Sequence, residues 1–352
     1  METLNYSKPI LVTGGTGYMA GWIIKLLLDE GREVRTTVRN LSQKDKYAHL
    51  TAIAVKSNGI LQFFEADLLK KGSFTAAMDG CELVIHTASP FIISGVKNAQ
   101  KQLIEPALEG TRNVLESVNI TESVKRVVLT SSVVAIYGDA VDLAKTENGV
   151  FTEKHWNFSS SVKHQPYSYS KTLAEKLAWE MAEAQKRWDL LTINPGFIMG
   201  PSLSKRTDST SIDLMIQLTS GKLRTGVPSG KMGVVDVRDV AKAHVLAGLS
   251  SNASGRHICV ADHKDFLDVA NIIRNNYPKY PLPKSYVPKW LFGIIAPMVG
   301  FTRKYVKLNV GIDLKLDNSY IRKDLKMDFI PFETTISDHF KQLINDGLVK
   351  EL

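Results

Sequence analysis

A tyrosine and a lysine that could share one site lie in the stretch QPYSYSKT, residues 165–172. Tyr167 and Lys171 are four positions apart, so on a helix their side chains lie on the same face, about 5–6 Å apart at Cβ. Tyr169 and Lys171 are two positions apart and point in different directions. If the segment is helical, Tyr167 is therefore the tyrosine that can share a site with the lysine. A phenol next to an ammonium group can exchange protons with a bound molecule.

The residues around this pair predict a helix over 167–187. Pro166 suits a first helical turn, where a backbone N–H is not needed. After it, apolar residues recur at 3.6-residue spacing, at Leu173, Ala174, Leu177, Ala178, Met181 and Ala182. Glu175 and Lys176 occupy polar positions between them, as on a solvent-facing surface. On spacing alone, Lys171 could equally be one more surface charge of this helix.

Length and composition indicate a globular protein with about two domains. The chain has 352 residues, of which 44% are hydrophobic and 23% charged. Cys81 and Cys259 form neither a disulfide framework nor a metal-ligand spacing, which is typical of a reducing compartment. We expect no bound metal. The N-terminus shows no signal-peptide organisation, and no run approaches the ~18 apolar residues of a membrane-spanning helix. We therefore expect a cytoplasmic protein.

The net charge of +8 does not by itself indicate a nucleic-acid partner. Lysines and arginines are spread along the chain, without a block of like charge or basic residues interleaved with aromatic ones. We expect no nucleic acid to bind. An excess of positive charge is compatible with anionic small molecules. The chain contains neither internal repeats nor low-complexity tracts.

Strands and helices are expected to alternate over the first ~200 residues. Short apolar runs predict strands at residues 10–13, 33–38, 61–66, 83–88, 126–131 and 190–195. Helical periodicity lies between them, at residues 19–30, 42–57, 73–78, 99–118 and 167–187. Such alternation is typical of a parallel sheet with helices on both faces. We predict an α/β protein with a Rossmann-type, doubly wound parallel sheet.

A glycine-rich turn follows the first strand, in the sequence TGGTGYMAGW. The spacing is Gly14-x-x-Gly17-x-x-Ala20, between a strand and a helix. Gly14 permits a tight turn, Gly17 lets a pyrophosphate approach the backbone, and Ala20 is small enough for the helix to pack on the sheet. The helix N-terminus offers free N–H groups to the phosphates. This context predicts a dinucleotide site.

The end of the second strand predicts which dinucleotide binds. An NAD site usually has Asp or Glu there, but this strand ends TTVRN, with Arg39 and no acid beside it. A guanidinium suits a 2′-phosphate and can stack on adenine, and Lys46 follows seven residues later. We therefore expect NADP(H). Asp67 and Leu68, which end the third strand, lie where an adenine edge would rest, although aspartate is also a common turn residue.

The domain division follows from where the alternation ends. We expect an NADP-binding domain over residues 1–196, with late sheet elements that return around 230–260. After Gly196 the elements become shorter and the turn signals more frequent. Residues 197–352 are expected to form mainly a smaller, substrate-binding domain.

Taken together, these segments resemble the extended short-chain dehydrogenases/reductases, and within them the dihydroflavonol-reductase-like branch. The matching segments are VTGGTGYMAGW, TVRN, ADL, IHTASP, VLTSS, YSYSK and INPGFIMGP, which cover roughly residues 8 to 260. Within the branch the chain looks more like microbial NADPH-dependent aldehyde/ketone reductases than like flavonoid enzymes. The resemblance implies a Ser-Tyr-Lys site made of Ser132, Tyr167 and Lys171. It also favours Tyr167 as the functional tyrosine and Tyr169 as a neighbour.

This resemblance implies a hydride-transfer mechanism. The nicotinamide carries the hydride, Tyr167 delivers a proton to the substrate oxygen, and Ser132 holds that oxygen with a hydrogen bond. An unperturbed tyrosine has a pKa near 10, and lowering it to about 7 requires roughly 4 kcal/mol of preference for the phenolate. We expect the Lys171 ammonium and the helix N-terminus to supply that preference. The family's lysine also holds the nicotinamide ribose.

By the same resemblance, further residues are expected to line the cofactor. They are Gly14, Thr16, Gly17, Tyr18, Met19, Arg39, Lys46, Asp67, Leu68, Thr87, Ala88, Ser89, Tyr167, Lys171, Pro195, Gly196, Phe197 and Ile198. His86 ends a strand that looks buried. We interpret the loop that follows it as a lining of the site and do not expect His86 to be an acid or base.

The substrate side is expected to be apolar. The resemblance places Phe91, Val133, Val134, Tyr137 and Phe197 there. No arginine cluster indicates a second pyrophosphate site, which a nucleotide sugar would need. An apolar aldehyde or ketone therefore fits best. Nucleotide-sugar epimerases or dehydratases and hydroxysteroid dehydrogenases share the same three residues and remain alternatives, as does a dinucleotide sensor without turnover.

The most apolar stretch is VPKWLFGIIAPMVGF, residues 287–301. It is too short, and too interrupted by proline, to span a bilayer. We interpret it as a helix packed near the substrate cleft, with an interfacial membrane contact as the less favoured alternative. We expect a monomer or a homodimer.

Overall fold

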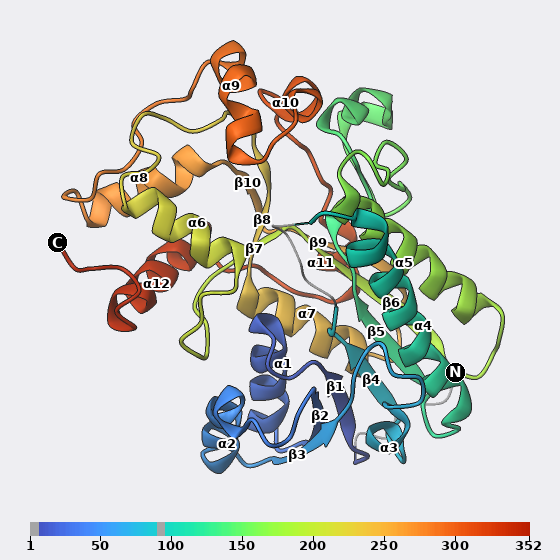
Figure 1. The fold of residues 1–352 in the computed structure, drawn as a ribbon. Helices are drawn as coiled ribbons and strands as arrows, with labels where there is room; N and C mark the ends of the chain where they lie inside the picture. The colour runs from blue at the N-terminus through green and yellow to red at the C-terminus, as the bar shows by residue number, and fades with distance from the viewer. Residues whose placement is uncertain (1–6, 90–95) are drawn as a thin grey trace.

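The computed structural model describes residues 7–89 and 96–352, and a seven-stranded parallel sheet forms its centre (Figure 1). Across the sheet the strands are β3 (Ile60–Glu65), β2 (Glu33–Val38), β1 (Ile10–Thr13), β4 (Leu83–His86), β5 (Arg126–Thr130), β6 (Asp189–Pro195) and β9 (Gly255–Cys259). The order changes direction between β1 and β4, as in doubly wound folds. The predicted α/β class is confirmed.

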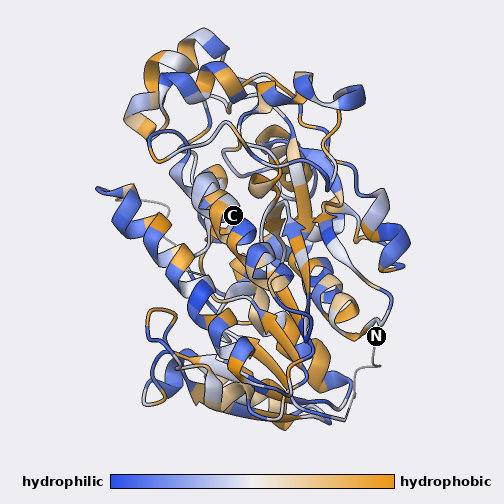
Figure 2. Ribbon diagram, turned by 90° about the vertical axis from the view of Figure 1, so that its right-hand side faces the viewer, coloured by the Kyte–Doolittle hydropathy of each residue, from blue (hydrophilic) through white to orange (hydrophobic). Residues whose placement is uncertain are grey.

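Helices cover both faces of this sheet (Figure 1). One face packs against α1 (Tyr18–Asp29), α2 (Ala48–Val55) and α7 (Val237–Leu249). The other packs against α3 (Thr75–Met78), α4 (Glu105–Ile120) and α5 (Pro166–Glu183). Figure 2 shows the strands as mainly hydrophobic between these layers.

The position of strand β1 explains why all its residues are buried and its sequence does not alternate between apolar and polar residues. Ile10 and Val12 point into the core on the α1 side, whereas Leu11 points into the core on the α4 side. Successive side chains of a strand face opposite sides of a sheet. When helices cover both sides, every position is buried, so a continuous apolar run is expected.

Three of the predicted helices differ clearly from expectation in their bounds. The segment 42–57 divides into the 3-10 turn η1 (Lys44–Lys46) and α2, and 99–118 begins as the π-helical turn η2 (Gln100–Ile104). Helix α5 begins at Pro166, as its first-turn position predicts, and ends at Glu183 instead of Arg187. Gln185 Oε1 accepts hydrogen bonds from the backbone N–H groups of Arg187 (2.7 Å) and Trp188 (3.1 Å), which turns the chain toward β6.

A second, three-stranded sheet follows β6. It contains β7 (Phe197–Met199), β8 (Met232–Asp236) and β10 (Asp262–Lys264), and helices α6 (Thr210–Thr219), α8 (Phe266–Asn276) and α12 (Phe332–Asn345) pack around it. Gly196 joins the two sheets. A Cβ at this position would lie 2.4 Å from the Gly233 carbonyl oxygen, so only glycine fits. The sequence predicted that elements around residues 230–260 would return to the large sheet. Strand β9 does so and lies beside β6.

The C-terminal region forms a helical hairpin. It consists of α9 (Lys289–Ile295), the 3-10 turn η6 (Ala296–Val299) and α10 (Arg303–Asn309), and α11 (Ser319–Asp324) then packs against β9. The expected helix in 287–301 is therefore present. Among residues 7–89 and 96–352, no helix combines the length and the apolar character needed to cross a bilayer.

Candidate active site

The glycine-rich turn connects β1 to α1 at the carboxyl edge of the sheet. Gly14 has φ +71°, and a Cβ there would lie 3.0 Å from Ala88 of the loop after β4. The residue must therefore be glycine both for its conformation and for this close approach. Ala20 is 1% exposed within α1, where a small side chain lets the helix pack on the sheet. The turn has the form that a pyrophosphate site requires.

The loop after β4 is bonded to the end of β1. The backbone N–H groups of Thr87 (3.2 Å) and Ala88 (3.1 Å) donate to Thr13 Oγ1, which also lies 2.9 Å from His86 Nδ1. His86 is buried, and this burial, together with the Lys171 charge, lowers its pKa to about 3. A neutral imidazole bonded to Thr13 supports the interpretation of His86 as a lining residue.

Lys171 reaches this loop from helix α5. Its Nζ donates to Ser89 Oγ at 3.0 Å, and the two residues line one pocket together with Leu68 and Ala88. Burial lowers the pKa of the lysine to about 8, against the opposing effect of the Glu175 carboxylate. Four of the cofactor residues expected from the sequence are thus brought together.

Tyr167 lies in the first turn of α5, one turn before Lys171. Part of its surface stays accessible, but desolvation raises the pKa of its phenol to about 12. This is opposite to the expected lowering toward 7. The reason is that loss of water disfavours the phenolate, whereas the Lys171 ammonium is directed to Ser89. At neutral pH the phenol therefore carries its proton.

Ser132 follows β5, in the turn before the short 3-10 helix η3 (Val133–Ala135). Its Oγ accepts a hydrogen bond from Val134 N–H at 3.3 Å, and its own O–H can be donated to a bound molecule. Its backbone carbonyl accepts from Asn194 Nδ2 at 3.1 Å. Helix α5 packs directly against η3, which places the serine and the tyrosine in neighbouring elements.

Glu175 belongs to this site, although its sequence pattern had placed it on a polar surface. It is 1% exposed, and its carboxylate accepts from Asn194 Nδ2 (2.7 Å), Arg256 Nε (2.6 Å) and the Ser131 hydroxyl. Ionic hydrogen bonds compensate the cost of burying the charge. Since Asn194 also holds the Ser132 carbonyl, this network supports the turn that carries the serine.

The residues expected at the adenosine end lie at the edges of β2 and β3. Arg39 directly follows β2, and both it and Lys46 are exposed. The Asp67 carboxylate accepts from the Leu69 N–H at 2.8 Å, as a turn aspartate does. Glu65, which pairs with Val38 in the sheet, brings an acid to this edge that the sequence reasoning did not consider.

A further cation, Arg206, lies beside the glycine-rich turn. Its guanidinium donates to the Thr16 carbonyl (3.4 Å) and lies 5.9 Å from the centre of the Tyr18 ring. The Tyr18 hydroxyl donates to the Gly200 carbonyl, and burial raises the pKa of this phenol. Met19 is 8% exposed, with its side chain in the core. Arg206 was missed because it lies about 190 residues after the turn, without a motif of its own.

The remaining predicted residues lie on both sides of the junction between the sheets. Pro195 ends β6, and Phe197 and Ile198 belong to β7. Val133 packs in a small apolar core with Ile136 and Phe151, against which Tyr137 is half-buried. Phe91 lies outside the described residues.

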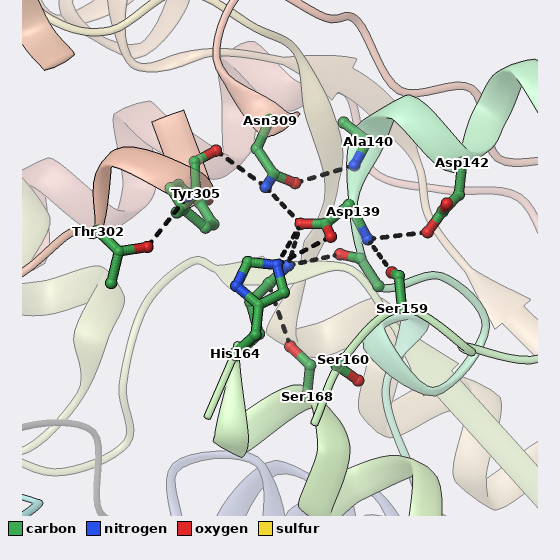
Figure 3. A network of polar contacts seen from close by, with 12 residues as sticks. Asp139, Ala140, Asp142, Ser159, Ser160, His164, Ser168, Thr302, Tyr305 and Asn309 are labelled. Atoms are coloured by element: carbon green, nitrogen blue, oxygen red, sulfur yellow. Dashed lines mark hydrogen bonds and ion pairs between the residues drawn. The ribbon is translucent and has the colours of Figure 1, made fainter. Parts of the chain in front are cut away.

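A polar network centred on Asp139 connects three parts of the chain (Figure 3). Its carboxylate bonds His164 Nε2 (2.8 Å), Gln165 Nε2 (2.7 Å) and Asn309 Nδ2 (2.7 Å). Gln165 immediately precedes α5 and has φ +53°, a conformation that these bonds help to hold. The network therefore links the start of the helix that carries Tyr167 to α10 of the hairpin.

The comparisons with known proteins agree with this geometry. The model of the NAD-dependent epimerase/dehydratase family matches residues 10–261. A cinnamoyl-CoA reductase from Medicago truncatula is 39% identical (82% of this chain, 88% of that protein), and tetraketide α-pyrone reductase 2 from Arabidopsis thaliana is 38% identical (86% and 92%). Yeast methylglyoxal/isovaleraldehyde reductase Gre2, complexed with NADPH, superposes with a TM-score of 0.78 at 28% identity (96% and 98%).

The fold and site thus define an enzyme that uses a nicotinamide dinucleotide. The chain belongs to the NAD-dependent epimerase/dehydratase family, the extended short-chain dehydrogenases/reductases, and within it to the dihydroflavonol-reductase-like branch. Sequence identity is higher to the plant reductases than to the yeast enzyme.

Proposed function

We propose that the protein reduces the carbonyl group of an apolar aldehyde or ketone to an alcohol, with NADPH as the hydride donor. The observation that carries this proposal is the position of Tyr167 and Lys171, one helical turn apart, with Lys171 Nζ 3.0 Å from Ser89 beside the glycine-rich turn. The named relatives are reductases, and the yeast structure contains NADPH, which supports both the reaction and the cofactor.

The residues present fit a dinucleotide. Gly14 and Gly17 leave two positions of the turn before α1 without a side chain, which suits a pyrophosphate. Arg39 and Lys46 are exposed at the edge of β2, where they can pair with a 2′-phosphate. When bound, the cofactor supplies the hydride. We assign its binding to residues 1–196 together with β9.

Three side chains share the proton chemistry. Tyr167, which is protonated at neutral pH, donates its proton to the carbonyl oxygen as negative charge develops there. The Ser132 hydroxyl donates a hydrogen bond to the same oxygen. The Lys171 ammonium holds the ribose hydroxyls and stabilises the phenolate that remains on Tyr167.

The substrate is assigned to the apolar side chains beyond Ser132. Val134 and Tyr137 follow the serine and Phe197 follows β6, and all three are partly exposed. Val133, which was also expected there, is buried in the small apolar core. Such a lining favours aromatic or medium-chain carbonyl compounds through burial of apolar surface. We assign this role mainly to residues 197–352, together with the segment after Ser132.

The two tyrosines of residues 165–172 provide the test. Tyr167→Phe should lower kcat at least a thousandfold, within the range of general acid catalysis and transition-state bonding, while NADPH binding stays intact. Tyr169→Phe is the matched control and should change kcat little. If the Tyr169→Phe enzyme were inactive and the Tyr167→Phe enzyme active, the assignment would be overturned.

A further inference from the structure

The helical hairpin α9–η6–α10 exposes an unusual concentration of apolar side chains. Six of the fifteen large hydrophobic side chains that are exposed in the described residues lie within positions 290–301. They are Trp290, Leu291, Ile294, Met298, Val299 and Phe301. The other nine are scattered, as is normal on a protein surface. A concentrated patch indicates a binding surface.

Helix α9 and the turn η6 are apolar on two opposite sides. Phe292 and Ala296 face inward and pack with Val306 and Val310 in the small core of the hairpin. Trp290, Ile294 and Met298 follow each other at four-residue spacing, and they are 71%, 59% and 86% exposed. A helix that is apolar around its circumference is stable only when something covers the outer side.

The charge of the sequence segment that contains this patch favours one kind of partner. Between residues 269 and 312 the sequence contains seven basic residues and no acidic one, namely Arg274, Lys279, Lys284, Lys289, Arg303, Lys304 and Lys307. Arg303, Lys304 and Lys307 are exposed on α10, next to α9. Apolar side chains that include tryptophan, flanked by lysine and arginine, are characteristic of helices that lie in the interface of an anionic membrane.

The position of the hairpin agrees with such a contact. In both views α9 lies at one extremity of the molecule, far from the seven-stranded sheet (Figures 1 and 2). Asn309, at the end of α10, accepts from Ala140 N–H at 2.9 Å and so attaches the hairpin to the catalytic side. In a dimer formed through this face, the same basic residues of the two copies would lie opposite each other. Their repulsion disfavours such a dimer.

We propose that the α9–η6–α10 hairpin binds the surface of an anionic lipid bilayer, with Trp290, Ile294 and Met298 inserted among the headgroups and Arg303, Lys304 and Lys307 facing the lipid phosphates. The helix expected from the sequence is present. The exposure of its outer face is what favours the membrane over packing near the cleft.

Co-sedimentation with vesicles tests this proposal. The full-length protein should bind vesicles of phosphatidylcholine mixed with phosphatidylserine, and bind phosphatidylcholine alone much less. Binding should weaken between low salt and about 0.15 M ionic strength. The double variant Trp290→Ser/Met298→Ser should lower partitioning at least tenfold. Arg303→Gln and Lys304→Gln should each lower it about fivefold.

The control variants distinguish binding through this surface from nonspecific hydrophobic binding and from loss of folding. Val55→Ser and Ile120→Ser remove apolar side chains that are 80% and 66% exposed elsewhere on the surface, and they should leave vesicle binding unchanged. Thermal unfolding of each variant confirms that it is folded. Absence of binding to anionic vesicles at low salt would overturn the proposal, as would binding that the Trp290/Met298 change leaves intact. Lipid-free self-association that this change abolishes would assign the surface to a second copy instead.

Discussion

Burial shifts the pKa values of Tyr167 and Lys171 in opposite directions. Desolvation raises the pKa of Tyr167 to about 12 and lowers that of Lys171 to about 8. Both shifts favour the neutral forms. The proposed carbonyl reduction would use the protonated phenol of Tyr167 and would benefit from the charged ammonium of Lys171. Of the two groups, Lys171 has the pKa closer to physiological pH.

The pH dependence of reduction should follow from these two values. Because the pKa of Lys171 is about 8, the ammonium is present below that pH and lost above it, whereas Tyr167 keeps its proton up to about 12. The logarithm of kcat/KM for reduction should therefore be level near neutrality and fall above about pH 8. In Lys171→Arg, whose guanidinium does not titrate in this range, the residual activity should not show that fall. A fall of the wild-type rate below pH 7 would contradict this assignment.

Arg39 should determine most of the cofactor preference. A charge-assisted contact with the 2′-phosphate is worth at least a factor of ten, although salt screens an exposed pair. We expect NADPH to be preferred over NADH by about a hundredfold when Lys46 contributes a second contact. Arg39→Ala should reduce kcat/KM for NADPH strongly and for NADH little, and Lys46→Ala should do the same to a smaller extent.

Two outcomes would count against this role of Arg39. Equal losses with both cofactors would mean that Arg39 only stacks on adenine. A wild-type preference for NADH would refute the assignment, and Glu65 at the neighbouring strand end would then be the first residue to consider as a ribose partner.

The roles of single residues could be predicted from the sequence where the residues belong to a local pattern with a fixed spacing. The i,i+4 relation of Tyr167 and Lys171 and the glycine-rich turn are local patterns, and the structure shows both in the expected elements. Glu175 was misplaced because a carboxylate within an amphipathic helix ordinarily faces solvent. Its partners Asn194 and Arg256 come from β6 and β9, and such long-range pairing leaves no local signal.

Between elements, the Asp139 network joins the helix of Tyr167 to the hairpin of the C-terminal region (Figure 3). Asn309 donates to Asp139 (2.7 Å) and accepts from Ala140 N–H (2.9 Å), so both its polar groups are used. Asn309→Ala should lower the free energy of unfolding by about 1–3 kcal/mol, because it leaves buried partners without that bond. Asn309→Asp should cost more, since it places a second carboxylate beside Asp139.

Chemical denaturation measures both changes. Asn275→Ala, at an exposed position of α8, is the matched control and should stay within about 0.5 kcal/mol of the wild type. If Asn309→Asp is as stable as Asn309→Ala, the network does not hold the hairpin in the way described.

The order of the elements was easier to predict than their ends. Apolar runs and helical periodicity located the six strands and the helices of the first part of the chain, because burial on both faces of a parallel sheet imposes that pattern. The end of α5 depends on the side chain of Gln185 bonding to the next backbone groups. The second sheet was not predicted, since β7 and β10 have three residues each and show too little periodicity.

For the whole molecule, we propose net reduction of an apolar carbonyl compound with NADPH. The family is named for epimerases and dehydratases, and a reaction in which the hydride returned to the substrate would consume no cofactor. The most direct measurement compares NADPH consumed with product formed, for aromatic and medium-chain aldehydes, activated ketones and nucleotide sugars. We predict one NADPH oxidised for each alcohol formed from the apolar aldehydes and ketones, and no turnover of nucleotide sugars. Conversion of a nucleotide sugar without net loss of NADPH, with no reduction of the carbonyl compounds, would contradict the account.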